Sequence, residues 1–195
     1  MQYSKIFYYL VTKLKYIRLN SNQALIMNEK EFLQIVLSFK DKMFRLAKRY
    51  VISKEVAEDI TQDVVLRLWM NRDKMKEYRN VEAFAMTMIK NACLDKLKAK
   101  NAQNLKIVHS NYKDESIRVA KDTEVKDSIS IVEKLMNELP EKQRIIMQLR
   151  DVEQYSFDEI GKILEINQVA IRVSLSRARK TIRQKLIKFH NYGVQ

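Results

Sequence analysis

Glycine and proline are nearly missing from this sequence, which has two glycines and one proline among 195 residues. Tight hairpins and phosphate-binding loops depend on glycine, because other residues are strained in their backbone conformations. β-Sandwiches, β-barrels, dinucleotide-binding folds and P-loops are therefore disfavoured. Since 46% of the residues are hydrophobic, the chain can still bury a core, and the sequence predicts an all-α protein of one or two small domains.

Metal-ligating and disulfide-forming residues are equally scarce. Cys93 is the only cysteine, and the two histidines, His109 and His190, lie far apart in the sequence. The sequence therefore predicts no disulfide, no metal site, no cofactor and no small-molecule substrate. No apolar run approaches the roughly 18–20 residues that cross a bilayer, and no signal-peptide cleavage site follows the apolar run 6–11. We expect a cytoplasmic protein.

The chain carries a net charge of +13, which indicates a polyanionic partner, nucleic acid first and an anionic membrane surface second. Residues 1–27 hold four bases and no acid. This basic N-terminal extension has three interpretations: an amphipathic arm that binds membrane or nucleic acid, a disordered extension, or a start codon placed too early before Met27.

Residues 28–100 have the apolar periodicity of three helices, expected at about 31–51, 53–69 and 81–98. Ser53 can cap the second helix, whose apolar stripe includes Ile60, Val64 and Leu68. From 101 to 127 the periodicity stops, and five acids balance five bases. A structureless stretch of this length is unusual inside one compact domain, so we expect a flexible linker and a second domain at 128–190.

A helix-turn-helix is expected at about 156–178. Ser156 and Glu159 have the spacing of a capping box, Asn167 can cap the next helix, and a three-residue turn separates the two helices. Gly161 stands inside the first helix, which indicates close backbone contact where the helices cross. The second helix is expected to reach about residue 189, with an inward stripe of Ile171, Leu175, Ala178, Ile182 and Leu186.

The opposite side of that second helix is basic. Between residues 168 and 190 there are seven bases and no acid. The outward positions are Val169, Arg172, Val173, Ser176, Arg177 and Lys180. Arginine and lysine neutralise phosphates, and Arg172 or Arg177 can bind guanine in the major groove. This side is predicted to bind DNA; the alternative is a solvated basic helix of an ordinary bundle.

Two further surfaces can be predicted from helix geometry. On the third helix Phe84, Thr87 and Asn91 share one edge, with Lys90 near it, and this edge suits an unstacked base, although such a set is often incidental. On the second helix the exposed side carries Asp59, Gln62, Asp63 and Leu66. No histidine or third acid accompanies these carboxylates, so the sequence predicts no enzyme. A basic protein partner, or simply solvent, can face them.

These residues resemble conserved regions 2 and 4 of bacterial RNA polymerase sigma factors, and within them the extracytoplasmic-function (ECF) group. The resemblance rests on residues 57–69, 84–95, 139–144 and 177–179 and extends over about 32–100 and 129–186. It implies a region 2 bundle at 28–100 and a region 4 helix-turn-helix domain at 128–190. The implied function is to bind core RNA polymerase, recognise a promoter and nucleate its opening without catalysing a reaction.

The resemblance also implies residue roles. Core polymerase would bind Asp59, Gln62, Asp63 and Leu66. The minus-ten element would bind Asn80, Phe84, Thr87, Lys90 and Asn91, and the minus-thirty-five element Gln168, Arg172, Val173, Ser176, Arg177 and Lys180. The implied partners are core RNA polymerase, promoter DNA and, in many members of the group, an anti-sigma factor. Two departures from the family pattern are Phe84, where tryptophan is usual, and Glu165, where glycine is usual.

The rival hypothesis is a free-standing helix-turn-helix transcriptional regulator that binds duplex DNA as a dimer and ignores polymerase. It predicts palindromic sites. It leaves unexplained both the acidic side of the second helix and the Phe84 edge of the third.

Overall fold

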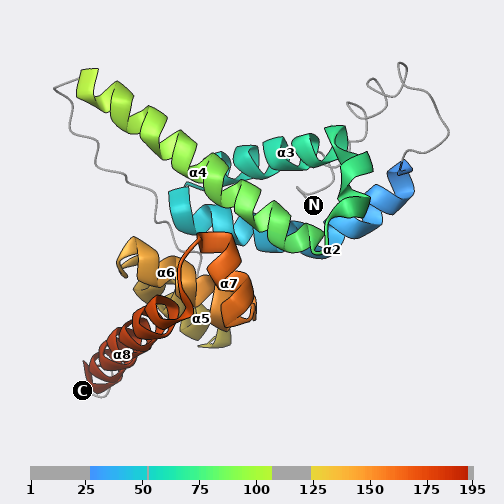
Figure 1. Ribbon diagram of the computed structural model, residues 1–195. Helices are drawn as coiled ribbons and strands as arrows, with labels where there is room; N and C mark the ends of the chain where they lie inside the picture. Colours follow the sequence, from blue (N-terminus) through green and yellow to red (C-terminus); the bar gives the residue numbers. More distant parts are fainter. Residues whose placement is uncertain (1–26, 52, 107–123, 193–195) are drawn as a thin grey trace.

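The computed structural model describes residues 27–51, 53–106 and 124–192 (Figure 1). In these ranges every regular element is a helix, which confirms the all-α prediction. None of the helices there is long and apolar enough to cross a bilayer. The prediction for the N-terminal extension concerns residues outside these ranges, apart from Met27. Met27 is buried, and its carbonyl accepts a hydrogen bond from Arg72 Nε at 3.3 Å.

Four helices form the first unit: α2 (Glu29–Val51), α3 (Lys54–Met70), the short 3-10 helix η2 (Arg72–Glu77) and α4 (Val81–Lys106). Their shared core contains Phe32, Met43, Leu68, Met86 and Ile89, all fully buried. The stripe expected on the second helix is confirmed, because Ile60, Val64 and Leu68 are buried.

Local capping starts α3 and α4 where the sequence places them. Ser53 Oγ accepts a hydrogen bond from the Val56 backbone N–H at 3.3 Å, and Asn80 Oδ1 accepts one from the Ala83 N–H at 2.9 Å. Each bond satisfies a backbone donor that the first helical turn leaves without an intrahelical partner.

The third helix is longer than the sequence analysis expected. We placed its end near residue 98 and the linker start at 101, and both boundaries were wrong, because α4 continues to Lys106. Residues 99–106 lack an apolar stripe but consist mainly of good helix formers, which favours a helical backbone there. Figure 1 shows these last turns projecting beyond α2 and α3. Most of the predicted linker, 107–123, lies outside the described residues.

The second unit comprises α5 (Glu124–Asn137), α6 (Glu141–Met147), the π-helical turn η3 (Gln148–Val152), α7 (Phe157–Leu164) and α8 (Gln168–Tyr192). Pro140 is the N-cap of α6 and stands one position before the first helical residue. Ile146, Leu149, Ile160, Ile163 and Ile171 are fully buried and form the core of this unit.

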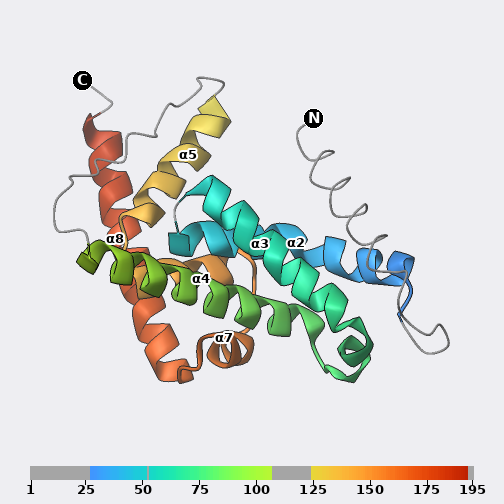
Figure 2. The same ribbon diagram turned by 90° about the horizontal axis from the view of Figure 1, so that it is seen from above.

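The two units pack against each other. α7 lies on α4, while α6 and η3 contact α2, so the helix-turn-helix rests on the side of the first bundle (Figure 2). The sequence analysis predicted two helical units but gave no reason to expect this contact.

Candidate nucleic-acid and polymerase interfaces

The helix-turn-helix is built from local signals that the structure confirms. Ser156 Oγ accepts from the Glu159 N–H at 3.2 Å, and Glu159 Oε2 accepts from the Ser156 N–H at 2.9 Å, which completes the capping box. A Cβ at Gly161 would lie 3.0 Å from the Ile166 carbonyl oxygen, so the turn backbone approaches α7 closely. Asn167 Oδ1 accepts from the Ala170 N–H at 2.8 Å and starts α8.

Glu165 closes α7 in the left-handed conformation, with φ of 58°. A residue with a Cβ is strained there by about 1 kcal/mol relative to glycine. The Glu165 carboxylate lies 2.6 Å from Lys90 Nζ on α4, and this lysine lowers the pKa of the Glu165 carboxyl below its usual value. The strained turn residue thus makes a contact that glycine could not make.

The predicted DNA-reading side of α8 is exposed. Val169 and Val173 are 67% and 43% exposed, whereas Ile171, Leu175, Ala178 and Ile182 are buried. The other residues assigned to the minus-thirty-five element, Gln168, Arg172, Ser176, Arg177 and Lys180, are also exposed on this helix. The inward stripe was extended too far, because Leu186 is 36% exposed. It lies beyond the part of α8 that packs on the core.

A basic groove of about 550 Å³ runs beside this side of α8, lined by Phe157, Arg172, Leu175, Ser176, Arg179, Lys180 and Arg183. Arg150 and Arg172 each place a guanidinium carbon 4.9 Å from the Phe157 ring centroid. Arg172 Nη2 also donates to Gln168 Oε1 at 3.1 Å. Two contacts therefore orient the Arg172 side chain, while its exposed surface faces the groove.

The edge of α4 assigned to the minus-ten element contains a small pocket. Tyr78 stacks on Phe84 with centroids 4.3 Å apart and planes at 22°. Together with Arg67, Leu68, Asn71, Lys74, Met75 and Met88, the two rings line a space of about 210 Å³. Aromatic walls beside basic and amide groups suit an unstacked base. Met88, which the sequence analysis did not single out, also lines this pocket.

The other residues assigned to the minus-ten element differ in exposure and in their hydrogen-bond partners. Asn91 is exposed, but the Thr87 hydroxyl donates to the Ala83 carbonyl at 3.0 Å. Lys90 is 7% exposed and pairs with Glu165 of the second unit. Asn80 Nδ2 donates to Glu159 Oε1 at 3.4 Å. The second unit therefore engages two of the five candidates.

The acidic side of α3 is available to a partner. Asp59 and Asp63 are exposed, and Gln62 and Leu66 are half-buried beside them. Within the described ranges, no cluster of three histidine, cysteine, aspartate or glutamate side chains could hold a metal ion.

The sequence analysis missed a set of polar contacts between the two units. Arg45 Nε and Nη2 each lie 2.8 Å from the Glu153 carboxylate, a bidentate pair that raises the pKa of Arg45. Arg49, Arg144 and Gln148 are buried: Arg49 Nε donates to Gln148 Oε1 at 2.8 Å, and Arg144 Nε donates to the Arg49 carbonyl at 2.9 Å. Burial lowers the pKa of Arg49. One signal was present in the sequence: Arg49, Arg144 and Gln148 occupy positions within the apolar periods of their helices.

Two family models match the chain: sigma-70 region 2 over residues 35–103, and sigma-70 region 4 over residues 129–182. The chain belongs to the sigma-70 family. This sigma factor is 25% identical over 166 residues to the ECF RNA polymerase sigma factor SigW of Bacillus subtilis, covering 80% of this chain and 88% of that protein. It is 24% identical over 153 residues to the ECF sigma factor SigM of Mycobacterium tuberculosis, covering 78% and 75%.

Solved structures share the fold of this sigma factor. The sigma factor RpoE of Bartonella quintana, determined in complex with the anti-sigma factor NepR, superposes with a TM-score of 0.68 at 22% identity, covering 82% of this chain and 98% of that chain. CnrH, determined with the cytosolic domain of CnrY, gives a TM-score of 0.57 at 17% identity over 83% and 90% of the two chains. The family expected from the sequence is confirmed, and the free-standing regulator is not favoured.

Proposed function

We propose that this sigma factor recognises its promoter through two separate surfaces and docks on core RNA polymerase through a third. The observation that carries the proposal is the helix-turn-helix, whose α8 exposes a continuous basic side next to a groove of about 550 Å³. A helix of this kind fits the major groove, where arginines bind guanine and lysines bind phosphates. We assign this side, with Gln168, Arg172, Val173, Ser176, Arg177 and Lys180, to the minus-thirty-five element.

We assign the minus-ten element to the N-terminal part of α4. The stacked pair Tyr78 and Phe84 offers an aromatic surface to a base that has left the duplex, and Asn91 offers an exposed amide to a base edge. Capture of unstacked bases stabilises the open form of the promoter, because the open form alone can fill the pocket. Promoter opening on this basis needs no chemical step, so we propose that the protein catalyses no reaction.

The acidic side of α3, with Asp59, Gln62, Asp63 and Leu66, is assigned to core polymerase. In a chain of net charge +13, an exposed pair of carboxylates beside a leucine favours a basic protein surface over DNA. We place the protein in the cytoplasm, where polymerase and the genome are found. Because RpoE of Bartonella quintana was solved with the anti-sigma factor NepR, we propose an anti-sigma factor as a further partner.

In vitro transcription tests this function. The purified chain is added to the core polymerase of its host together with a library of genomic fragments, and the transcripts are sequenced. We expect start sites downstream of one shared two-part motif that core polymerase alone does not use. Failure to bind core polymerase, or transcripts without a shared motif, would contradict the proposal.

A further inference from the structure

One arginine of α8, outside the six residues assigned to the minus-thirty-five element, is paired with a carboxylate. Arg179 Nη2 lies 2.5 Å from one oxygen of Asp151 in η3, and Arg179 Nε lies 3.1 Å from the other. Two parallel hydrogen bonds fix the plane of a guanidinium as well as its position. Asp151 therefore sets the direction in which Arg179 presents its remaining donors.

This pair leaves one edge of the guanidinium unused. Arginine carries five side-chain N–H donors, and Asp151 accepts from the Nε–H and from one N–H of Nη2. The other N–H of Nη2 and one N–H of Nη1 form a second parallel pair, whose spacing matches two oxygens of a phosphate. In the described residues the hydrogen bonds of this side chain are the two to Asp151, and the side chain is 53% exposed.

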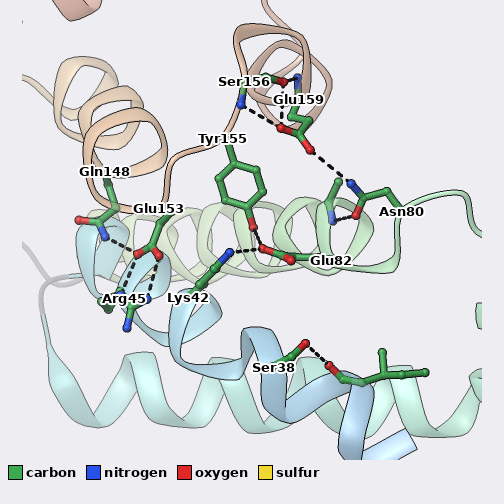
Figure 3. A network of polar contacts seen from close by, with 12 residues as sticks. Ser38, Lys42, Arg45, Asn80, Glu82, Gln148, Glu153, Tyr155, Ser156 and Glu159 are labelled. Atoms are coloured by element: carbon green, nitrogen blue, oxygen red, sulfur yellow. Dashed lines mark hydrogen bonds and ion pairs between the residues drawn. The ribbon is translucent and has the colours of Figure 1, made fainter. Parts of the chain in front are cut away.

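The segment that carries Asp151 is anchored on both sides. Within η3, Gln148 Nε2 donates to Glu153 Oε1 at 2.7 Å, and both residues are buried. After η3, the capping box of Ser156 and Glu159 begins α7 (Figure 3). A carboxylate on a segment fixed in this way can hold an arginine in one orientation before a ligand arrives.

A hollow of about 260 Å³ opens beside the pair and is lined by Arg150, Asp151, Gln154 and Arg179. The two arginines bring two positive charges, and the single negative charge of Asp151 is already paired with Arg179. Gln154 has a φ of 65°, a left-handed conformation that glycine adopts without strain. A residue with an amide side chain is thus kept at the hollow in a strained conformation. These donors and charges suit an anion.

The position of Arg179 along α8 indicates which anion. Arg179 also lines the groove of about 550 Å³, together with Arg172, Ser176 and Lys180 of the predicted DNA-reading side. It follows Arg172 by seven residues, which is two turns and about 10 Å along the helix axis. In helix-turn-helix proteins the N-terminal residues of the second helix contact base edges. A side chain two turns later is placed to meet the sugar-phosphate strand that borders the groove.

We propose that Asp151 is a positioning residue for DNA binding: it holds Arg179 so that the free edge of the guanidinium binds a backbone phosphate at the hollow beside Gln154. The proposal rests on the proposed function for the assignment of α8 to DNA. It gives an acidic residue a favourable role on a basic surface. Without Asp151 the same arginine keeps its charge but loses its orientation, so a phosphate must order the side chain when it binds.

The sign of the effect distinguishes this role from simple charge repulsion. Asp151→Asn removes a negative charge next to DNA, which by itself strengthens binding, yet we expect binding to weaken because the fork is lost. Asp158→Asn is the matched control: Asp158 lies on α7, pairs with Lys162 at 2.6 Å and is remote in sequence from Arg179. This control removes the same charge and is expected to bind DNA as tightly as the wild type or more tightly.

Fluorescence anisotropy of a short labelled DNA duplex of randomised sequence, titrated with the free full-length chain, measures the effect. We expect Arg179→Ala to bind about tenfold more weakly, with a salt slope smaller by about one, and Asp151→Asn about threefold more weakly. The double variant should bind no more weakly than Arg179→Ala alone, because Asp151 acts through Arg179. Thermal unfolding followed by circular dichroism checks folding, and an exposed ion pair of this kind is expected to leave the midpoint nearly unchanged.

Binding by Asp151→Asn that equals or exceeds that of the wild type would overturn the positioning role, and so would a further loss in the double variant. Sequencing the bound fraction of the randomised pool tests the ligand: wild type and Asp151→Asn should retain the same base preferences, and a change at one base pair would overturn the phosphate assignment. The transcription assay is independent of these results. A wild-type chain that binds duplex DNA but supports no transcript contradicts the proposed function while the role of Asp151 stands.

Discussion

Arg172 is held by two neighbours in a way that prepares it for DNA. The Phe157 ring lies under its guanidinium, Gln168 accepts one of its N–H groups, and Arg150 also places its guanidinium over the Phe157 ring. Arg150 is itself fixed, because its Nη1 donates to the Tyr155 carbonyl at 2.8 Å. An arginine whose rotamers are already restricted loses less conformational entropy when it binds a base.

Arg172→Ala is expected to cost about 1–3 kcal/mol of promoter affinity and to relax the preference at one base pair of the minus-thirty-five element. The measurement is binding of the holoenzyme to a promoter library with and without the substitution. A loss that is uniform across all sequences would reassign Arg172 to a phosphate contact.

Phe157→Ala is expected to weaken the same base preference through Arg172. A double-mutant cycle of Phe157→Ala with Arg172→Ala should give a coupling of about 1 kcal/mol, whereas a cycle with Arg177→Ala should be additive. Phe157→Tyr keeps the ring and should restore the preference. Additive losses in both cycles would show that Phe157 acts only in packing.

Among the helices, α3 has one apolar side and one acidic side. Its inner side fills the core with Ile60, Val64 and Leu68, and its outer side presents Asp59 and Asp63 to solvent. Because the inner side alone holds the bundle together, charges on the outer side can be changed at little cost to stability.

Asp59→Lys with Asp63→Lys is expected to abolish co-elution with core polymerase, because it reverses the charge offered to a basic surface. The control Asp41→Lys with Asp95→Lys makes the same change in net charge at exposed positions of α2 and α4. We expect that control to bind core polymerase normally. If both variants lose binding together, the effect comes from net charge and not from the α3 surface.

Element starts were predictable and element ends were less so. Ser53, Ser156 and Asn167 cap their helices through hydrogen bonds to backbone three residues away, and such local geometry can be read from sequence. The end of α4 at Lys106 follows helix propensity rather than the apolar period, and Leu186 is exposed because it lies beyond the part of α8 that packs on the core. Neither is encoded in the apolar period alone.

For the whole molecule, the contact between the two units was the feature that the sequence did not predict. Lys90 and Glu165 are 75 positions apart, and Arg45 and Glu153 are 108 apart. In the sequence, each of these four residues resembles an ordinary surface charge. Such pairs follow from the tertiary arrangement, for which a single sequence carries no periodic signal. The candidate interfaces could therefore be predicted as helix faces. That the second unit engages two residues of one of these faces could not be predicted.

Stability of the first unit is expected to fall in alkaline solution. Burial raises the pKa of the Cys93 thiol to about 12 and raises the pKa of Tyr50 above its ordinary value. Both groups are neutral when protonated, so their contribution is fully present below their unfolded pKa values, about 8.5 and 10, and is lost as the pH rises toward the folded values.

The single tryptophan, Trp69, is buried in this unit and provides the measurement. Urea unfolding followed by Trp69 fluorescence should give a constant free energy of unfolding from about pH 7 to 8 and a decrease from about pH 8.5 upward. In Cys93→Ala the decrease should begin only near about pH 10, where tyrosine titrates. An unchanged onset in that variant would contradict the role of the thiol.

Glu165 also determines how easily the contact between the two units can change by mutation. Glutamate and glycine codons differ by one nucleotide, so a single point mutation exchanges a strained turn with a bond to Lys90 for a relaxed turn without one. Neither core is disturbed by the exchange, because the side chain is exposed. The contact between α4 and the turn before α8 is thereby gained or lost within one mutational step, while the exposed side of α8 stays as it is.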